Sequence, residues 1–416
     1  MIFDIHKSPF VRWSHLIAFG LLCAVPPLLL FARAGADIAV VLVGLIFLTR
    51  STVNKDWAWA REIDILILLG TWVILNLLVS PFAYDIERSF GRSLSWLRFI
   101  IFYAAVTRWL LVDKSALRIM AATMLVTVFV AAADAAFQFF SGYSALGGQP
   151  MTRRLTGPLD RPNIAIYLAK VFFASMSLAF VIKLTTGDKR LFNTSIILVP
   201  LVFVIIFLSG ERTASVLTVG AIMCALAGLF LVGGVSRIIA IVTGSLCAAG
   251  LVLLVSLSDR IAARLQALST VLSDYSESIY GELVLLGWKI FTENPITGIG
   301  MGNFGRVCPN YQPLGLIAEC HPHPHNFYIE WLSDTGLLGT LPFLAFVAVI
   351  VFAGLRRIRP GHPQTFLAGL YIGTLALSLF PLAATQSAFS NWPAIVAWTS
   401  ISCAVAALRS LDTQKS

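Results

Sequence analysis

The feature that most restricts the fold of this chain is a series of apolar runs of about 18 to 22 residues, the length that a helix needs to cross roughly 30 Å of hydrocarbon. Of the 416 residues, 58% are hydrophobic and only 12% are charged. The runs predict an all-α polytopic membrane protein with about twelve transmembrane helices. They lie at 13–32, 36–49, 63–80, 93–112, 117–140, 163–184, 192–209, 213–233, 238–256, 337–355, 364–384 and 392–408.

The basic residues indicate how these helices are oriented. The net charge of +9 is compatible with nucleic-acid binding, but most Lys and Arg lie in short connections between apolar runs. By the positive-inside rule these connections face the cytoplasm, which places both termini there. The first run, 13–32, is not preceded by a separate charged leader or followed by a cleavage site, so we expect it to remain as a span.

The longest connection, 257–336, is predicted to lie on the opposite side, between the ninth and tenth spans of a single membrane domain formed by residues 1–416. Its first part, 259–268, has apolar residues at helical spacing. A second helix is expected over 282–291, ended by Asn294-Pro295. Because aromatic and aliphatic residues occur throughout, we expect this connection to be folded.

Glycines and cysteines shape the second half of this connection. The glycines of 298–305 follow a helical stretch rather than a strand, so we interpret them as turn residues and not as a dinucleotide-binding loop. Cys308 and Cys320 lie twelve residues apart. If this side is an oxidising periplasm, the two can form a disulfide that holds the segment before the histidines.

Several arginines on the expected outer side do not follow the charge rule, and they are Arg153, Arg154, Arg161, Arg212, Arg260 and Arg264. Guanidinium groups grip phosphate bidentately and keep their charge, so these residues predict an outward-facing site for an anionic, phosphate-bearing ligand. Arg212 is the most informative, because the very short turn 209–214 leaves it little room to reach water. The alternative is that the arginines meet lipid headgroups or pair with Asp160, Glu211 and Asp259.

Two ionisable residues lie within expected spans, where a charge is costly. They are Asp134, in the fifth span, and Lys170, about two turns into the sixth. We interpret them as a pair that neutralises its own charge. Lys170 also stays a candidate for binding the ligand.

Three of the six histidines, His321, His323 and His325, fall within five residues just before an apolar run. Alternating imidazoles could bind zinc, although zinc normally takes a third or fourth ligand and the interleaved prolines keep the segment extended. His321 and His323 are otherwise expected to be solvated loop residues. A neutral imidazole, with an ordinary pKa of about 6.5, can accept a proton near neutral pH.

The pattern His325-Asn326, nine further residues, Gly336-Leu-Leu-Gly339 resembles the signature of the O-antigen ligase family. The segments 154–165, 209–215 and 293–304 resemble further parts of the same superfamily. The resemblance implies transfer of O-antigen from undecaprenyl pyrophosphate to a sugar hydroxyl of lipid A core, in lipopolysaccharide biosynthesis. It places the reaction at the periplasmic face of a Gram-negative inner membrane and implies that no metal or nucleotide cofactor takes part.

Carried over residue by residue, the resemblance makes His325 and Arg212 the catalytic residues. The candidate substrate-binding residues are Arg161, Arg264, Arg260, Arg154, Asn163, Lys170, Asn326, Tyr280 and His323. Relatives often carry an arginine where this chain has Tyr280, so Arg260 or Arg264 is expected to take over its phosphate-binding role. The expected partners are the lipid-linked donor, the lipid A core acceptor and the bilayer, without nucleic acid, and a monomer is compatible with the sequence.

Three other functions stay open. An O-antigen polymerase would use the same donor with a second lipid-linked glycan as acceptor, and a protein O-oligosaccharyltransferase would use a protein. A transporter or flippase would explain charges inside spans, but transporters more often show repeated halves and broken helices.

Overall fold

A computed structural model describes residues 9–151, 154–257, 278–383 and 385–412. These parts of the chain contain helices and no strand, so the predicted all-α class is confirmed. The helices are α1 (Pro9–Phe31), α2 (Arg33–Val53), α3 (Ile63–Ile74), α4 (Ile86–Ala105), α5 (Lys114–Ser141), α6 (Ile164–Thr186), α7 (Arg190–Leu208), α8 (Arg212–Val232), α9 (Gly234–Leu257), α11 (Ile279–Glu293), α12 (Phe304–Val307), α13 (Phe327–Leu355), α14 (Gln364–Leu379) and α15 (Asn391–Arg409). Four predicted features lie outside the described residues: Arg153, Arg260, Arg264 and the stretch 259–268.

Nine helices among the described residues are long and apolar enough to cross a membrane, and two shorter apolar helices, Gly234–Gly250 and Gln364–Leu379, accompany them. Each predicted apolar run falls on a helix. The run 93–112 begins on α4, which is neither one of the nine long apolar helices nor one of the two shorter ones. This helix carries charged residues such as Arg92 and Arg98 along its length. The chain is therefore a multi-pass membrane protein, while the orientation of its helices stays a prediction.

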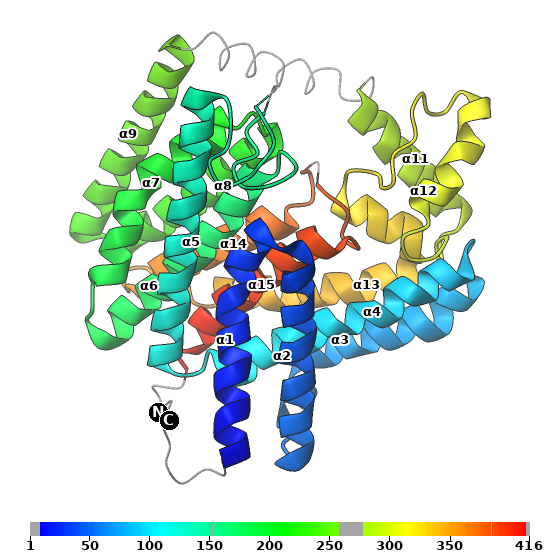
Figure 1. Cartoon of the computed structure of the whole chain (residues 1–416), viewed down its shortest axis with the longest axis horizontal. Helices are drawn as coiled ribbons and strands as arrows, with labels where there is room; N and C mark the ends of the chain where they lie inside the picture. The colour runs from blue at the N-terminus through cyan, green and yellow to red at the C-terminus, as the bar shows by residue number, and fades with distance from the viewer. Residues whose placement is uncertain (1–8, 152–153, 258–277, 384, 413–416) are drawn as a thin grey trace.

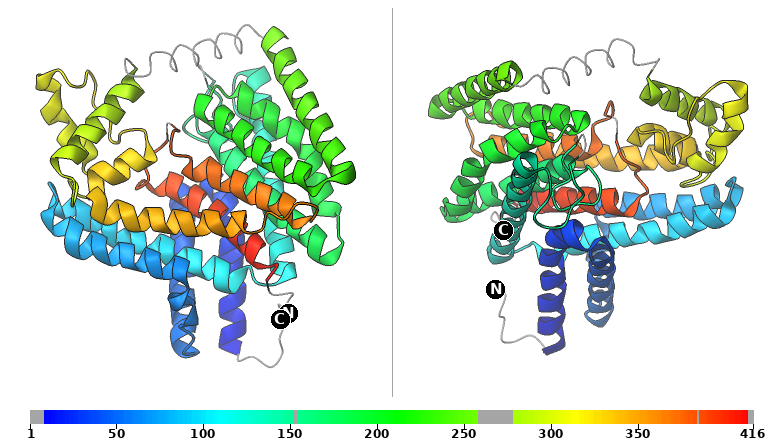
Figure 2. Two further views of the ribbon diagram at one scale, coloured as in Figure 1. Left: turned by 180° about the vertical axis from the view of Figure 1, so that it is seen from behind. Right: turned by 45° about the horizontal axis from the view of Figure 1, so that its top comes forward.

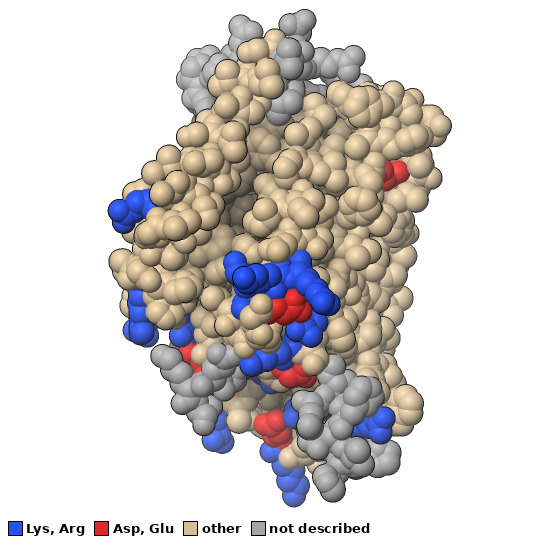
Figure 3. All heavy atoms as spheres, turned by 90° about the vertical axis from the view of Figure 1, so that its left-hand side faces the viewer, with Lys and Arg blue, Asp and Glu red and all other residues tan. Residues whose placement is uncertain are grey.

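The helices form two groups with α14 and α15 between them. Figure 1 shows α5 to α9 on one side and α3, α4 and α13 side by side on the other, steeply inclined to α1 and α2. The two further views in Figure 2 show the same arrangement. On the face seen in Figure 3, basic side chains gather in the lower half, and the upper half is almost free of charge.

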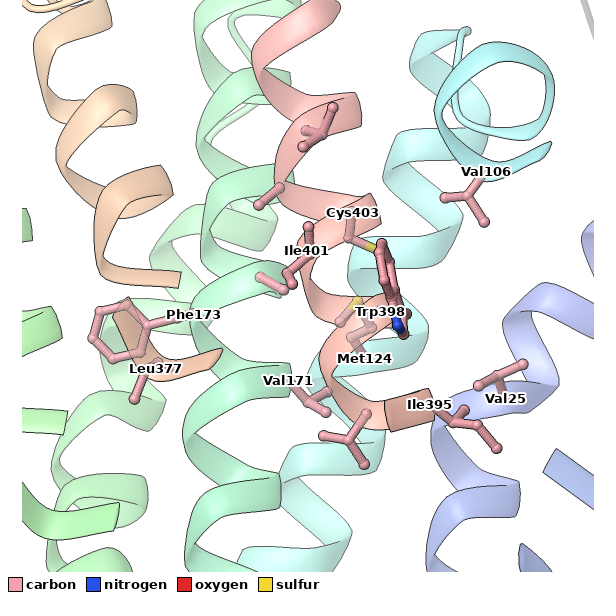
Figure 4. Close-up of a cluster of buried hydrophobic side chains, with 14 of the residues drawn as sticks. Val25, Val106, Met124, Val171, Phe173, Leu377, Ile395, Trp398, Ile401 and Cys403 are labelled. Carbon is pink, nitrogen blue, oxygen red and sulfur yellow. The ribbon is translucent and has the colours of Figure 1, made fainter. Parts of the chain in front are cut away.

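Helices α6 and α15 form the interior. In the most apolar 18-residue stretch of each helix, 89% of the residues are buried in α6 and 83% in α15, compared with 28% in α8. Figure 4 shows Trp398 and Cys403 of α15 packed among residues of α6, α5 and α1, including Val171 and Met124. A helix that is apolar all round is stable when neighbours cover every face, whereas α8 leaves much of its surface for lipid.

A break in α13 positions the glycine-rich segment. We expected the helix to begin at 337, but it begins at Phe327 and is interrupted at Gly336, where φ is 57° and ψ is −161°. Four backbone hydrogen bonds, from Ile299 to Ser333, Gly300 to Asp334, Leu337 to Pro295 and Leu338 to Ile296, span 2.8–3.1 Å and fill the break. The helix therefore starts earlier than predicted because another segment satisfies the backbone groups that the break leaves open.

The remaining part of the long connection has its own small core. Helix α11 covers the predicted helix 282–291 and ends at Glu293, directly before the expected Asn294. Its Leu283, Leu286 and Ile290 pack against Phe304 and Ile317. Cys308 and Cys320 form a disulfide, with their Cα atoms 5.8 Å apart, as the sequence allowed. This cluster is thereby linked covalently to the residue directly before His321.

Candidate active site

A cavity of about 430 Å³ lies where α6, α8, α13, α14 and α15 meet, and connections before α6 and α15 complete its wall. One part of its lining is charged or polar, and another consists of aromatic and aliphatic side chains. The charged and titratable residues that line it are Arg154, Lys170, Glu211, Arg212, Tyr280 and His325. Residues from four distant parts of the sequence therefore face one volume.

Two hydrogen bonds bring the arginine-bearing segments together. The amide of Leu155 donates to the carbonyl of Ser209 over 3.0 Å. The amide of Ala165, in the first turn of α6, donates to Oε1 of Glu211 over 2.7 Å. These bonds join the connection that carries Arg154 to the turn before α8, whose first residue is Arg212.

Neither arginine at this cavity is neutralised by an ion pair. The expected partner Asp160 lies 3.8 Å from Arg33 instead, and Glu211 binds a backbone amide. Within the described parts of the chain, Arg154 and Arg212 form no salt bridge and are exposed. Pairing with Asp160 is therefore wrong as an explanation for these arginines, and their charge remains available to an anion.

The carboxyl of Glu211 has an unusual environment for an acid. Burial raises its pKa to about 8, although the amides of Ala165 and Ile166 and the charge of Arg154 act in the opposite direction. A carboxyl with this raised pKa is mostly protonated at neutral pH, so Glu211 offsets little of the charge of the neighbouring cations. The sequence suggested Glu211 only as a partner for an arginine, so its place in the lining was missed.

The predicted pair between Asp134 and Lys170 is wrong. Asp134 is buried and accepts hydrogen bonds from the Ser144 hydroxyl and the amides of Ala145 and Leu146, over 2.7–3.0 Å. Asp134 therefore holds the connection after α5 in place. Its position inside a predicted span did not show which residues its carboxyl group would contact. Lys170 lines the cavity instead and adds a third cation.

His325 has a constrained backbone and a crowded ring. Its φ of 54° lies in the left-handed region, which a residue with a Cβ rarely adopts. The amide of Thr385 donates to its carbonyl over 2.6 Å. Its imidazole lies edge-on to the Tyr280 ring, with centroids 5.4 Å apart, and His323 and His321 lie 4.2 and 5.2 Å away by the same measure.

The surroundings of the histidines favour neutral imidazoles. Burial lowers the pKa of His325, and a positive charge on His321 would lower it further. Burial and His325 together lower the pKa of His323 to about 4. A neutral ring nitrogen can accept a proton. Among the described residues, no group of three or more His, Cys, Asp or Glu side chains is arranged to hold a metal ion.

Asn326, predicted to bind substrate, has a structural position instead. Its Oδ1 accepts hydrogen bonds from the amides of Tyr328 and Ile329 over 3.0 and 3.1 Å, which caps the start of α13. Its Nδ2 donates to the carbonyl of Pro381 over 2.8 Å. The residue after the histidine is therefore an asparagine because α13 begins there.

The structure does not bring every predicted residue to the cavity. Asn163 and Tyr280 line it, whereas Arg161, His323 and Asn326 do not. The connection between α14 and α15 supplies much of one wall, including Thr385, Gln386, Ser387 and Ala388. Nothing in its sequence indicated a function, because it contains no basic or histidine-rich motif.

Residues 196–344 match the family model described as O-Antigen ligase. This part of the chain is similar to the O-antigen ligase family. The matched O-antigen ligase region runs from within α7 to within α13, so it includes Arg212, Tyr280 and His325 but not Arg154 or Lys170. The match supports a glycosyltransferase-like ligase or polymerase function in lipopolysaccharide biosynthesis, with lipid-linked glycans as substrates in a membrane. No curated protein matches the chain.

Proposed function

We propose that this protein transfers O-antigen from undecaprenyl pyrophosphate to a sugar hydroxyl of lipid A core, at the periplasmic face of a Gram-negative inner membrane. The observation that supports this most directly is that His325, Arg212, Arg154 and Lys170 line one cavity that also has an apolar part. A phosphate, a sugar hydroxyl and a lipid chain each find suitable side chains there.

The cationic residues bind the pyrophosphate of the donor. Arg212 and Arg154 can each present two parallel N–H donors to phosphate oxygens, and Lys170 adds a point charge at the membrane side. As the sugar departs, negative charge grows on the pyrophosphate, and these cations stabilise it. They take the part that a divalent cation plays in many other glycosyltransferases, in line with the metal-independent reaction that the family implies.

His325 activates the acceptor. Its neutral imidazole takes the proton of the acceptor hydroxyl while the oxygen forms a bond to the anomeric carbon of the donor glycan. The bond between that carbon and the phosphate oxygen breaks, and its electron pair leaves with undecaprenyl pyrophosphate. Attack from the side opposite the leaving group inverts the anomeric centre, so retention of configuration in the product would contradict this mechanism.

The apolar part of the cavity accommodates the first isoprenyl units of the donor. Phe327, Phe343 and Phe346 of α13 and Trp398 and Ile401 of α15 line this part. Burying apolar surface stabilises such a complex by about 25 cal/mol per Å². The same aromatic residues keep water from the reacting pyrophosphate, which favours transfer over hydrolysis.

The test uses purified protein in lipid nanodiscs with a fluorescent undecaprenyl-pyrophosphate glycan as donor. Lipid A core, a second lipid-linked glycan and an acceptor protein are supplied in separate reactions, and products are resolved by electrophoresis and mass spectrometry. We expect a product with lipid A core only. A product with the second lipid-linked glycan identifies a polymerase, and one with protein an oligosaccharyltransferase.

Two matched pairs of variants test the residues. His325→Ala and Arg212→Ala should lower the rate at least about 100-fold, because each removes a group that acts in the transition state. His362→Ala and Arg161→Ala are controls of the same residue types that are exposed and do not line the cavity. Wild-type rates in His325→Ala or Arg212→Ala would refute the role of that residue, and transport of unchanged donor without any product would favour a flippase.

A further inference from the structure

The connection between α14 and α15 is held to the start of α13 by a row of hydrogen bonds. The Tyr328 hydroxyl donates to the carbonyl of Leu379 over 2.7 Å, and Nδ2 of Asn326 to that of Pro381 over 2.8 Å. The amide of Thr385 donates to the carbonyl of His325 over 2.6 Å. One wall of the cavity is therefore attached to the same helical turn that follows the catalytic histidine.

Glu330 makes the last of these attachments. Its Oε1 accepts a hydrogen bond from the Ser387 hydroxyl over 2.5 Å, and its Oε2 accepts one from the amide of Ala388 over 2.6 Å. The side chain is buried, with 2% of its surface exposed, and it does not line the cavity. Both carboxyl oxygens of Glu330 therefore accept hydrogen bonds from the same short segment, 387–388.

Residues 385–388 are consequently fixed at both ends, at one end by the residue before the N-cap of α13 and at the other by the first turn of this helix. Thr385 is fixed at the carbonyl of His325 and Ala388 at Glu330. The left-handed backbone of His325 is strained for a residue with a Cβ and persists only when its surroundings hold it. If Ala388 were released, the amide of Thr385 could move away and the backbone of His325 could relax.

We propose that Glu330 is a positioning residue for glycan transfer. It fixes residues 385–388, and through Thr385 it keeps the His325 imidazole directed at the acceptor hydroxyl. This inference rests on the proposed function in one respect, because it takes His325 as the base. Glu330 itself touches neither substrate.

The role depends on hydrogen-bond geometry, which distinguishes it from a role of charge. In Glu330→Gln, the amide oxygen can accept from Ala388 while the amide nitrogen donates to the Ser387 hydroxyl, which can be donor or acceptor. In Glu330→Asp, the acid remains but the side chain is one methylene shorter and cannot reach both partners. Positioning therefore predicts that Gln substitutes for Glu better than Asp does, and a role of charge predicts the reverse.

The kinetic test measures kcat and the KM for donor in both variants. We expect Glu330→Asp to lose about 100-fold in kcat, as a displacement of about 1 Å at a catalytic group does, with little change in KM. Glu330→Gln should stay within about threefold of the wild-type kcat. Equal loss in both variants, or a more active Asp variant, would overturn the proposal.

A matched control is provided by Asp134, another buried carboxyl that holds a connection through one hydroxyl and backbone amides but does not line the cavity. Asp134→Glu and Asp134→Asn should lower the unfolding temperature without the contrast in kcat between acid and amide. The same contrast at Asp134 would mean that general destabilisation explains the effect at Glu330.

A second measurement does not depend on catalysis. Hydrogen–deuterium exchange of the Thr385 and Ala388 amides should accelerate in Glu330→Asp and stay near wild type in Glu330→Gln. If wild-type protein transferred no glycan, the proposed function would fail, and exchange would still decide whether Glu330 holds this wall. Unchanged exchange in Glu330→Asp would overturn the proposal even in an active enzyme.

Discussion

The break in α13 allows a quantitative prediction for Gly336→Ala. Gly336 has φ of 57° and ψ of −161°, a combination that is almost confined to glycine. A Cβ at this position would lie 2.3 Å from the carbonyl oxygen of Ile296 and 2.6 Å from the amide nitrogen of Gly298. Both contacts are with backbone, so neither can be relieved by a side-chain rotation.

The expected loss of stability has two sources. Forcing a non-glycine residue into this conformation costs about 1 to 3 kcal/mol. Moving the segment 295–300 away from the new Cβ weakens backbone hydrogen bonds in the break, each of which stabilises the fold by about 1 kcal/mol. Loss of two of them brings the total to about 3 to 5 kcal/mol, which should be visible as a much lower unfolding temperature.

The assay is thermal unfolding of the purified variants in one detergent, followed by intrinsic tryptophan fluorescence and by size-exclusion chromatography after heating. Gly220→Ala in α8 is the matched control, because a Cβ there meets no atom within 4 Å. Within a helix, alanine is favoured over glycine by up to about 1 kcal/mol, so this control should be neutral or stabilising. If Gly336→Ala unfolded at the same temperature as Gly220→Ala, the role assigned to the break would be wrong.

Three further predictions concern the site and its surroundings. The transfer rate should fall on acidification only below the ordinary histidine pKa of about 6.5, because the base must be neutral and burial lowers the pKa of His325. A pH–rate profile tests this prediction, and a fall in rate that begins above neutral pH would contradict it. The pKa of His323 is lowered to about 4 in the fold, so the protein should become less stable as the pH falls from about 6.5 to about 4, because only the unfolded chain takes up the proton in this range. The variant His323→Gln should flatten the pH dependence of the unfolding temperature. Reducing the disulfide between Cys308 and Cys320 should destabilise the outer cluster by about 2 to 3 kcal/mol, as expected for a loop of this size, and faster proteolysis between α11 and α13 under reducing conditions would reveal it.

Much of the helical architecture could be predicted from the sequence, because a membrane leaves few alternatives to an apolar helix. The helix over 282–291 was found by its spacing and by Asn294-Pro295 at its end. The start of α13 was placed at 337 rather than at Phe327 because Ser333, Asp334 and Thr335 look like a polar connection. Those residues are buried and partly bonded to the glycine-rich segment, a contact that no local pattern contains.

The candidate site was predictable where chemistry restricts the residue type. A guanidinium in a turn as short as that before α8, and a histidine at the mouth of an apolar helix, are unusual enough to be noticed in one sequence. Asn326 was assigned to substrate because the motif joins it to His325, yet its side chain caps a helix. The partner of Asp134 could not be identified either, since depth in a span does not show which loop folds back over it.

By itself, the sequence determined that this chain forms apolar helices, that cations gather in particular connections and that a histidine precedes a long membrane helix. Tertiary structure alone decided that Arg154, Arg212 and His325 share one cavity, and that the connection after α14 forms a wall beside them. The physical reason is that apolar periodicity shows which face of a helix is buried but not which neighbour buries it. Side chains separated by more than a hundred residues meet only once the helices have packed.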